Sequence, residues 1–280
     1  MSIPKLWVTV AVFGLLILQA AQIIVVVHRE SLTFDEEDHM YAGYRMWTAG
    51  DYGLNPEHPP LVKLLATLPV LGQKLWTPPL MGIFFKGEAY VDGQLWLQHN
   101  DGASQRLVFR MRLATIALAL ALSLLIFFAT RAWFGVTAAL IALTFAVFEP
   151  NLLAHSGLVT TDLGCALFFL AAIYTFYRYV KQPNWTTLVV AGLAAGLLLA
   201  TKHSGILVGP VLPLLAAWEV AVAPKGAQAT RAPAWRSVCA DRGAEPGGAV
   251  ELLRLPVCSA ACGPATHSDA VTVFSRIEAF

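Results

Sequence analysis

The sequence predicts an all-α membrane protein, a polytopic bundle of about six transmembrane helices. Of its 280 residues, 57% are hydrophobic and only 13% are charged, whereas soluble domains carry about a quarter charged residues. Residues 6–27 contain no charged side chain, which is long enough to cross about 30 Å of hydrocarbon. A cleaved signal peptide has a shorter apolar core and a small-residue cleavage site, so we expect this segment to remain as the first span.

Five further apolar runs follow the first span, at residues 113–130, 132–148, 161–180, 185–201 and 206–223. Several are shorter than the roughly 20 residues of an isolated span, which a bundle tolerates because neighbouring helices cover the ends. Gly192 and Gly196 form a GxxxG pair, typical of closely packed helices. Pro210 and Pro213 predict a kink in the last run.

A long polar insertion, about residues 28–110, separates the first two spans. Thr33 and Glu36 fit a capping box at the start of a helix that Gly50 ends. A second short helix is expected from Pro59 to about Gln73. Its amphipathic pattern predicts a helix that lies along the interface rather than crosses.

The distribution of basic residues predicts the orientation. With Lys5 inside, the inner loops hold Arg131, Arg178 and Lys181, whereas the loop at 149–162 has no Lys or Arg. The positive-inside rule then places the insertion on the extracytoplasmic face. We expect a bacterial inner membrane protein with this face in the periplasm. The net charge of +1, without a basic stripe, argues against nucleic-acid partners.

Counting the predicted membrane crossings places the polar clusters on one face of the membrane. Two spans after Asp35 the chain returns to the same face at EPNLLAHSGLVTTD, and two more crossings return it to that face at Lys202-His203. His58 lies in the insertion and is already there. The predicted arrangement is a reaction centre at the membrane surface.

Each cluster also has a structural interpretation. Acidic residues at 35–38 suit the first turn of a helix, where the macrodipole favours them, and Asp162 follows two threonines as a capping residue would. His58 and His155 are typical of hydrogen-bonded structural histidines. Lys202 is typical of a basic side chain that extends from a helix end to the interface.

Four stretches occur in a specific order: FDEEDHMYAGYRMWTAGDYGLNPEHPPLVKLL, RLATIALALALSLLIFFATRAWFG, EPNLLAHSGLVTTDL and LLATKHSGIL. Their combination resembles the phospholipid-carrier-dependent glycosyltransferases of the GT-C superfamily, in particular the protein O-mannosyltransferases and the lipid A aminoarabinose transferases. The resemblance covers about residues 6–222.

The resemblance implies a role for particular residues. Asp35 would deprotonate or orient the acceptor hydroxyl, with Glu36 as its partner and Asp162 as the second acidic position. Substrate or carrier-phosphate binding is implied for a further set, namely His58, Lys63, Arg112, Lys202 and His203.

The resemblance also implies the substrates. The donor would be a sugar linked through phosphate to a polyprenol, and the acceptor a hydroxyl of a protein or glycolipid. Lys202 and Arg112 would offset the charge of the leaving phosphate. A divalent cation remains open, with Asp35, Asp162 and His155 as its candidate ligands.

Residues 224–280 depart from the family pattern. They are rich in Ala, Gly, Pro and Arg, hold three of the four cysteines and show no sustained periodicity. We expect the transferase domain to comprise residues 1–223, and the tail to be disordered or frameshifted. Family members continue through further spans, so a chain that ended here would lack part of its site, and an inactive fragment of the transferase is an alternative.

Two other classes of function remain open. A transporter or channel would have ionisable residues in mid-span and paired broken helices, whereas these charges cluster at span ends. A membrane-anchored binding protein could use the insertion without catalysis. A metalloprotease is disfavoured because the sequence lacks HExxH.

Overall fold

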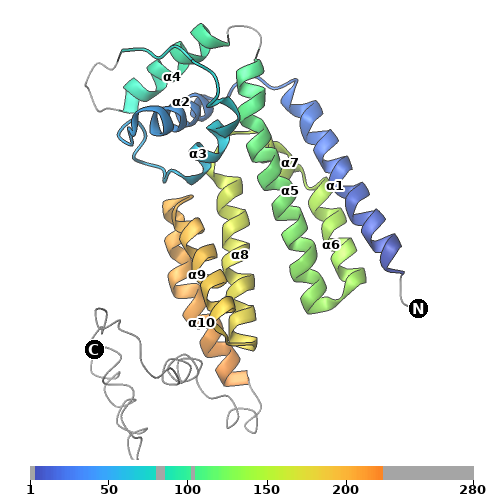
Figure 1. Cartoon of the computed structure of the whole chain (residues 1–280). Coiled ribbons are helices and arrows are strands. Elements are labelled where there is room, and N and C mark those ends of the chain that lie inside the picture. The colour runs from blue at the N-terminus through green and yellow to red at the C-terminus, as the bar shows by residue number, and fades with distance from the viewer. Residues whose placement is uncertain (1–3, 80–85, 102–104, 223–280) are drawn as a thin grey trace, which may run out of the picture. The chain divides into compact units, whose positions relative to one another are not determined.

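A computed structural model describes residues 4–79, 86–101 and 105–222 of the chain. All regular secondary structure in these ranges is helical, which confirms the predicted all-α class (Figure 1). The predicted irregular tail at 224–280 lies outside the described residues.

Three described helices are long and apolar enough to cross a membrane: α1 (Lys5–Val27), α5 (Arg106–Phe134) and α8 (Thr161–Lys181). A fourth candidate is the pair α6 (Val136–Phe148) and α7 (Pro150–Ser156), which bends by 61° at its break. Helix α5 begins before the predicted run at 113–130. Its first seven residues include three arginines, so hydropathy did not include them in the apolar run.

The last two predicted spans form shorter helices. Helices α9 (Trp185–Leu199) and α10 (Val208–Val222) have 15 residues each, about 22 Å at 1.5 Å per residue. Of the about six predicted spans, three described helices, or four with the bent pair, have the length and composition of a membrane span, and α9 and α10 are shorter apolar helices. The breaks at Glu149 and at Ala200–Lys202 fall close to the ends of the predicted runs at 148 and 201.

Helix α5 lies at the centre of the membrane part, with α1, α6 and α8 packed on it (Figure 1). Helices α9 and α10 pack on α8 instead. The GxxxG prediction is wrong about the contact, because a Cβ added at Gly192 or Gly196 would meet no atom within 4 Å. The face of α9 that packs inward carries Ala191, Ala194 and Leu198.

The insertion forms three helices at the end of the bundle where α5 begins (Figure 1). These are α2 (Phe34–Ala49), α3 (Leu61–Thr67) with the 3-10 turn η1 (Leu68–Val70), and α4 (Lys86–Asn100). The second predicted helix is thus shorter than expected, and α4 was not predicted. Met40, Tyr41, Trp96 and Met111 form the core that joins α2, α4 and α5.

Helix α2 has the predicted ends. The carboxylate of Glu36 accepts hydrogen bonds from the backbone N–H and the hydroxyl of Thr33, both at 3.1 Å. At the other end Gly50 adopts a φ of 65°, a left-handed conformation that glycine accepts without strain.

Candidate active site

A buried ion pair between Glu36 and Arg112 organises this end of the bundle. Arg112 Nε donates to Glu36 Oε1 at 2.9 Å, and Nη2 donates to Oε2 at 2.6 Å. Both side chains are inaccessible, at 0% and 1% exposed. A bidentate ion pair of this kind is geometrically specific. Because both groups are buried, removing either charge leaves the other without its counter-charge.

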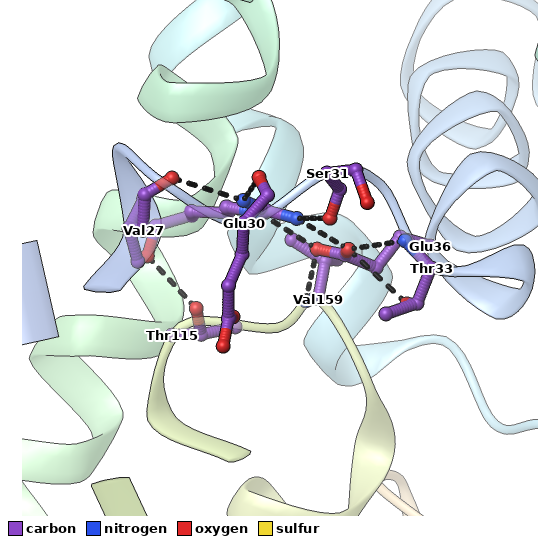
Figure 2. Close-up of polar contacts among 8 residues, drawn as sticks. Val27, Glu30, Ser31, Thr33, Glu36, Thr115 and Val159 are labelled. Carbon is purple, nitrogen blue, oxygen red and sulfur yellow. Dashed lines mark hydrogen bonds and ion pairs between the residues drawn. The ribbon is translucent and has the colours of Figure 1, made fainter. Parts of the chain in front are cut away.

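The same pair holds two other segments of the chain. Arg112 donates to the backbone carbonyls of Val27, Glu30 and Ser31 at 3.1–3.3 Å, where α1 ends. The backbone N–H of Val159, just before α8, donates to Glu36 Oε1 at 3.0 Å. Figure 2 shows these contacts converging from α1, α2, α5 and the segment before α8.

Glu36 and Arg112 are therefore occupied by each other and by the backbone. The substrate-contacting role that the resemblance implied for each of them stays a prediction. Their geometry suits a positioning role, because the pair fixes the turn that carries Asp35 next to the segment that leads into Asp162.

Asp35 lies one position before Glu36 and is exposed. Its Oδ1 accepts a hydrogen bond from the Tyr90 hydroxyl at 3.0 Å, and the Tyr90 ring stacks on Phe34 at 4.2 Å between centroids. Sequence reasoning missed Tyr90 because it lies on α4. The contact orients a carboxylate that remains open to solvent.

Asp162 and Lys202 form an ion pair at the same end. Asp162 lies in the first turn of α8, and Lys202 immediately precedes the 3-10 segment His203–Leu207. Both remain partly accessible, at 51% and 30% exposed. An accessible pair contributes only about 0–1 kcal/mol, so the ammonium can take another anion at little cost. His203 is exposed beside it.

Close contacts hold the start of α3, which follows the His-Pro-Pro segment, against the residues that lead to Lys202. The Leu61 N–H donates to the Ala200 carbonyl at 2.9 Å, two residues before Lys202. A Cβ at Gly164 would approach the side chain of Val62 to 2.7 Å and that of Thr201 to 3.0 Å. The start of α3, the start of α8 and the end of α9 thus meet at one point.

His39 is a further member of the site, which sequence reasoning missed. It lies one helical turn after Asp35, is only 4% exposed, and its ring meets that of His58 edge-on at 4.9 Å between centroids. Burial lowers the pKa of His39 to about 3, with the charges of His58 and Lys63 acting in the same direction and those of Asp35 and Asp162 opposing it. Both carboxylates therefore lie within electrostatic reach of one neutral imidazole.

Lys63 lies beneath this cluster and is fully buried. Its Nζ donates to the carbonyls of Asn55 and His58 at 2.7 and 2.8 Å. Burial lowers the pKa of Lys63 to about 8, opposed by the charge of Asp38. Lys63 holds the loop that carries His58, and its implied contact with the carrier phosphate stays a prediction.

The candidate cation ligands do not assemble into a site. No group of three or more His, Cys, Asp or Glu side chains that could hold a metal ion occurs in the described part of the chain. His155 is exposed on α7, in the segment that precedes Asp162. A divalent cation stays a prediction.

Comparison with known protein families finds a match for one segment of the chain. Residues 105–230 match the family model described as dolichyl-phosphate-mannose-protein mannosyltransferase. The match confirms the expected resemblance over this segment, and the long apolar helices indicate an integral membrane protein. No curated protein and no solved structure matches the chain.

The mannosyltransferase match includes Arg112, Asp162 and Lys202 but begins after Asp35 and His58. The contacts of Glu36 connect the two parts, because its carboxylate binds both Arg112 and Val159 inside the matched segment. The insertion and the matched segment therefore share one polar core.

Proposed function

We propose that this protein moves a sugar from a polyprenyl-phosphate carrier to an acceptor hydroxyl at the extracytoplasmic membrane face. The observation that carries the proposal is the convergence of an exposed carboxylate, Asp35, and an accessible acid–base pair, Asp162 and Lys202, around His39. The family match to a mannosyltransferase supports a glycosyl transfer reaction. In this proposal residues 1–223 form the transferase domain.

Asp35 is proposed as the general base. It lies in the first turn of α2 and is exposed. The acceptor hydroxyl gives its proton to the Asp35 carboxylate while its oxygen attacks the anomeric carbon. The bond from that carbon to the phosphate oxygen breaks, and the electron pair leaves with polyprenyl phosphate. A single displacement of this kind inverts the anomeric configuration.

Lys202 is proposed to bind the phosphate that leaves. The carrier's tail must stay in the lipid, so its phosphate lies at the membrane surface, at the level of helix ends. Lys202 lies at such an end, and its accessible pair with Asp162 can open to take a phosphate oxygen. A positive charge there stabilises the negative charge that develops on the leaving group. Asp162 would then hold Lys202 in place before the donor binds.

The neutral state of His39 supports the proposal that Asp35 is the general base. A protonated imidazole one turn from Asp35 would pair with the carboxylate and weaken it as a base. Because burial lowers the pKa of His39 to about 3, its imidazole is neutral at pH 7 and does not form an ion pair with Asp35. We place the reaction in the periplasm of a bacterium, with a protein or glycolipid as acceptor.

Asp35→Asn tests the proposal in the full chain, reconstituted in vesicles with polyprenyl-phosphate mannose. Loss of a general base lowers the rate by about 100-fold or more, so we expect sugar transfer to fall by that factor while membrane insertion is unchanged. Asp51→Asn is the matched control, since Asp51 lies in the same insertion but pairs with Arg45 away from the cluster. Equal turnover of Asp35→Asn and wild type would remove Asp35 from the mechanism.

A further inference from the structure

A cavity of about 490 Å³ lies between the end of α1 and the start of α5. Part of its wall is apolar, formed by Val27, Val108, Phe109 and Leu113. Its basic residues are His28, Arg106 and Arg110, with the buried Arg112 behind them. The His28 ring stacks on Phe109 at 4.6 Å between centroids, which fixes one side of the cavity.

The cavity lies at the level where two spans leave the hydrocarbon. The uncharged stretch of α1 ends at Val27, and the uncharged stretch of α5 begins at Leu113. These two positions are side by side, because Arg112 donates to the Val27 carbonyl at 3.3 Å. Lipid headgroups occupy the zone just outside the hydrocarbon, so the cavity faces the depth at which lipid phosphates lie.

The charge in this cavity is not balanced by the contacts of the protein. Arg106 and Arg110 are exposed and one helical turn apart, and neither guanidinium makes a hydrogen bond or ion pair within the described ranges. They lie in the first turns of α5, where the macrodipole disfavours cations. The nearby carboxylate of Asp101 caps the backbone N–H groups of Leu107 and Val108, at 2.9 and 3.2 Å.

We propose that this cavity binds the phosphate group of a membrane lipid. Arg106 and Arg110 hold the phosphate oxygens, and the apolar wall receives the first carbons of the lipid chain. Arginine suits this role because its planar donors match phosphate geometry. The cavity is built from different side chains than the Asp35, Asp162 and Lys202 cluster, so the inference does not depend on the proposed function.

Two lipids carry the required chemistry, an anionic phospholipid of the bilayer and a polyprenyl phosphate. Native mass spectrometry of the full chain in a neutral detergent distinguishes them. The probes are phosphatidylglycerol, polyprenyl phosphate, phosphatidylcholine and inorganic phosphate. We expect retention of phosphatidylglycerol or polyprenyl phosphate, and whichever binds more tightly identifies the source of the phosphate.

The decisive variant is R106Q/R110Q, with R131Q as the matched control, because Arg131 is an exposed arginine at the other end of α5. We expect at least tenfold weaker retention in R106Q/R110Q, partial recovery in R106K/R110K and no change in R131Q. Circular dichroism and the melting temperature establish that each variant is folded. Equal retention in R106Q/R110Q and wild type would overturn the proposal. So would equal binding of phosphatidylcholine, or equally tight binding of inorganic phosphate alone.

Discussion

Arg112 and Glu36 are 76 positions apart in sequence, yet their side chains form a buried two-pronged ion pair with contacts at 2.9 and 2.6 Å. The pair joins the first turn of α2 to the second turn of α5. Through backbone contacts to Val27 and Val159 it also holds the end of α1 and the entry to α8. The polar end of the bundle is therefore organised around one interaction.

Breaking this pair on one side should destabilise the protein strongly. Arg112→Met leaves the carboxylate of Glu36 buried without its counter-charge, which costs about 3–5 kcal/mol. We expect the double variant Glu36→Gln with Arg112→Met to lose less than the sum of the two single variants. Denaturant titration in detergent measures the free energies of unfolding.

The solvent-accessible ion pair between Asp162 and Lys202 provides the control for that experiment. Asp162→Asn should change the free energy of unfolding by about 1 kcal/mol or less, because the side chains of Asp162 and Lys202 are both partly exposed to solvent. Additive losses in the Glu36 and Arg112 double variant would show that the two side chains are not coupled.

Charge reversal at Lys202 tests its proposed phosphate contact. Lys202→Glu should raise the KM for the polyprenyl-phosphate sugar about tenfold or more, because it replaces attraction with repulsion at the carrier phosphate. The KM for the acceptor should change little. Lys181→Glu is the comparison, since Lys181 pairs with Glu219 away from the cluster. An equal rise in both KM values for Lys202→Glu would exclude a specific phosphate role.

The buried His39 predicts a pH dependence of stability. Its pKa is about 3 in the folded protein and about 6.5 when exposed, so between these values the unfolded chain binds the proton and the folded chain does not. Stability is therefore fully present above pH 6.5 and falls as the pH is lowered toward 3. The slope from this one group is at most about 1.4 kcal/mol per pH unit.

His39→Gln isolates this contribution from that of the carboxylates. The difference in free energy of unfolding between the variant and wild type should change between pH 7 and pH 5, in the direction that makes wild type relatively less stable at pH 5. His155→Gln, at an exposed histidine, should leave the dependence unchanged. A pH-independent difference for His39→Gln would contradict a buried neutral imidazole.

Gly43 and Gly192 give a matched pair of glycine substitutions. A Cβ at Gly43 would lie 2.4 Å from the Lys63 carbonyl oxygen, so Gly43→Ala should separate α2 from α3 at a cost of about 1–3 kcal/mol. Gly192→Ala meets no atom within 4 Å and should stabilise α9 by up to about 1 kcal/mol, because alanine favours helix. Thermal unfolding measures both. A neutral Gly43→Ala would contradict the close crossing of α2 and α3.

Much of the framework follows from local pattern. The capping box at Thr33 and Glu36 was predicted because it depends on residues three positions apart. The apolar runs predicted helices for the same reason, and the breaks at Glu149 and Ala200 fall close to the ends of those runs. Helix α4 lacked a helical apolar pattern. It packs closely on α2 instead, where a Cβ at Gly93 would approach the Glu37 carbonyl oxygen to 2.7 Å.

The sequence by itself determined the all-helical class, the ends of α2 and, through the family resemblance, the set of candidate residues. Only the tertiary structure decided which of these residues are exposed and which are buried. Asp35 remains exposed while Glu36, its neighbour, is fully buried against Arg112. His39 and the cavity beside Arg106 also emerged only there. The physical reason is that burial and charge pairing depend on residues brought together from distant segments, and a pattern along one helix does not contain them.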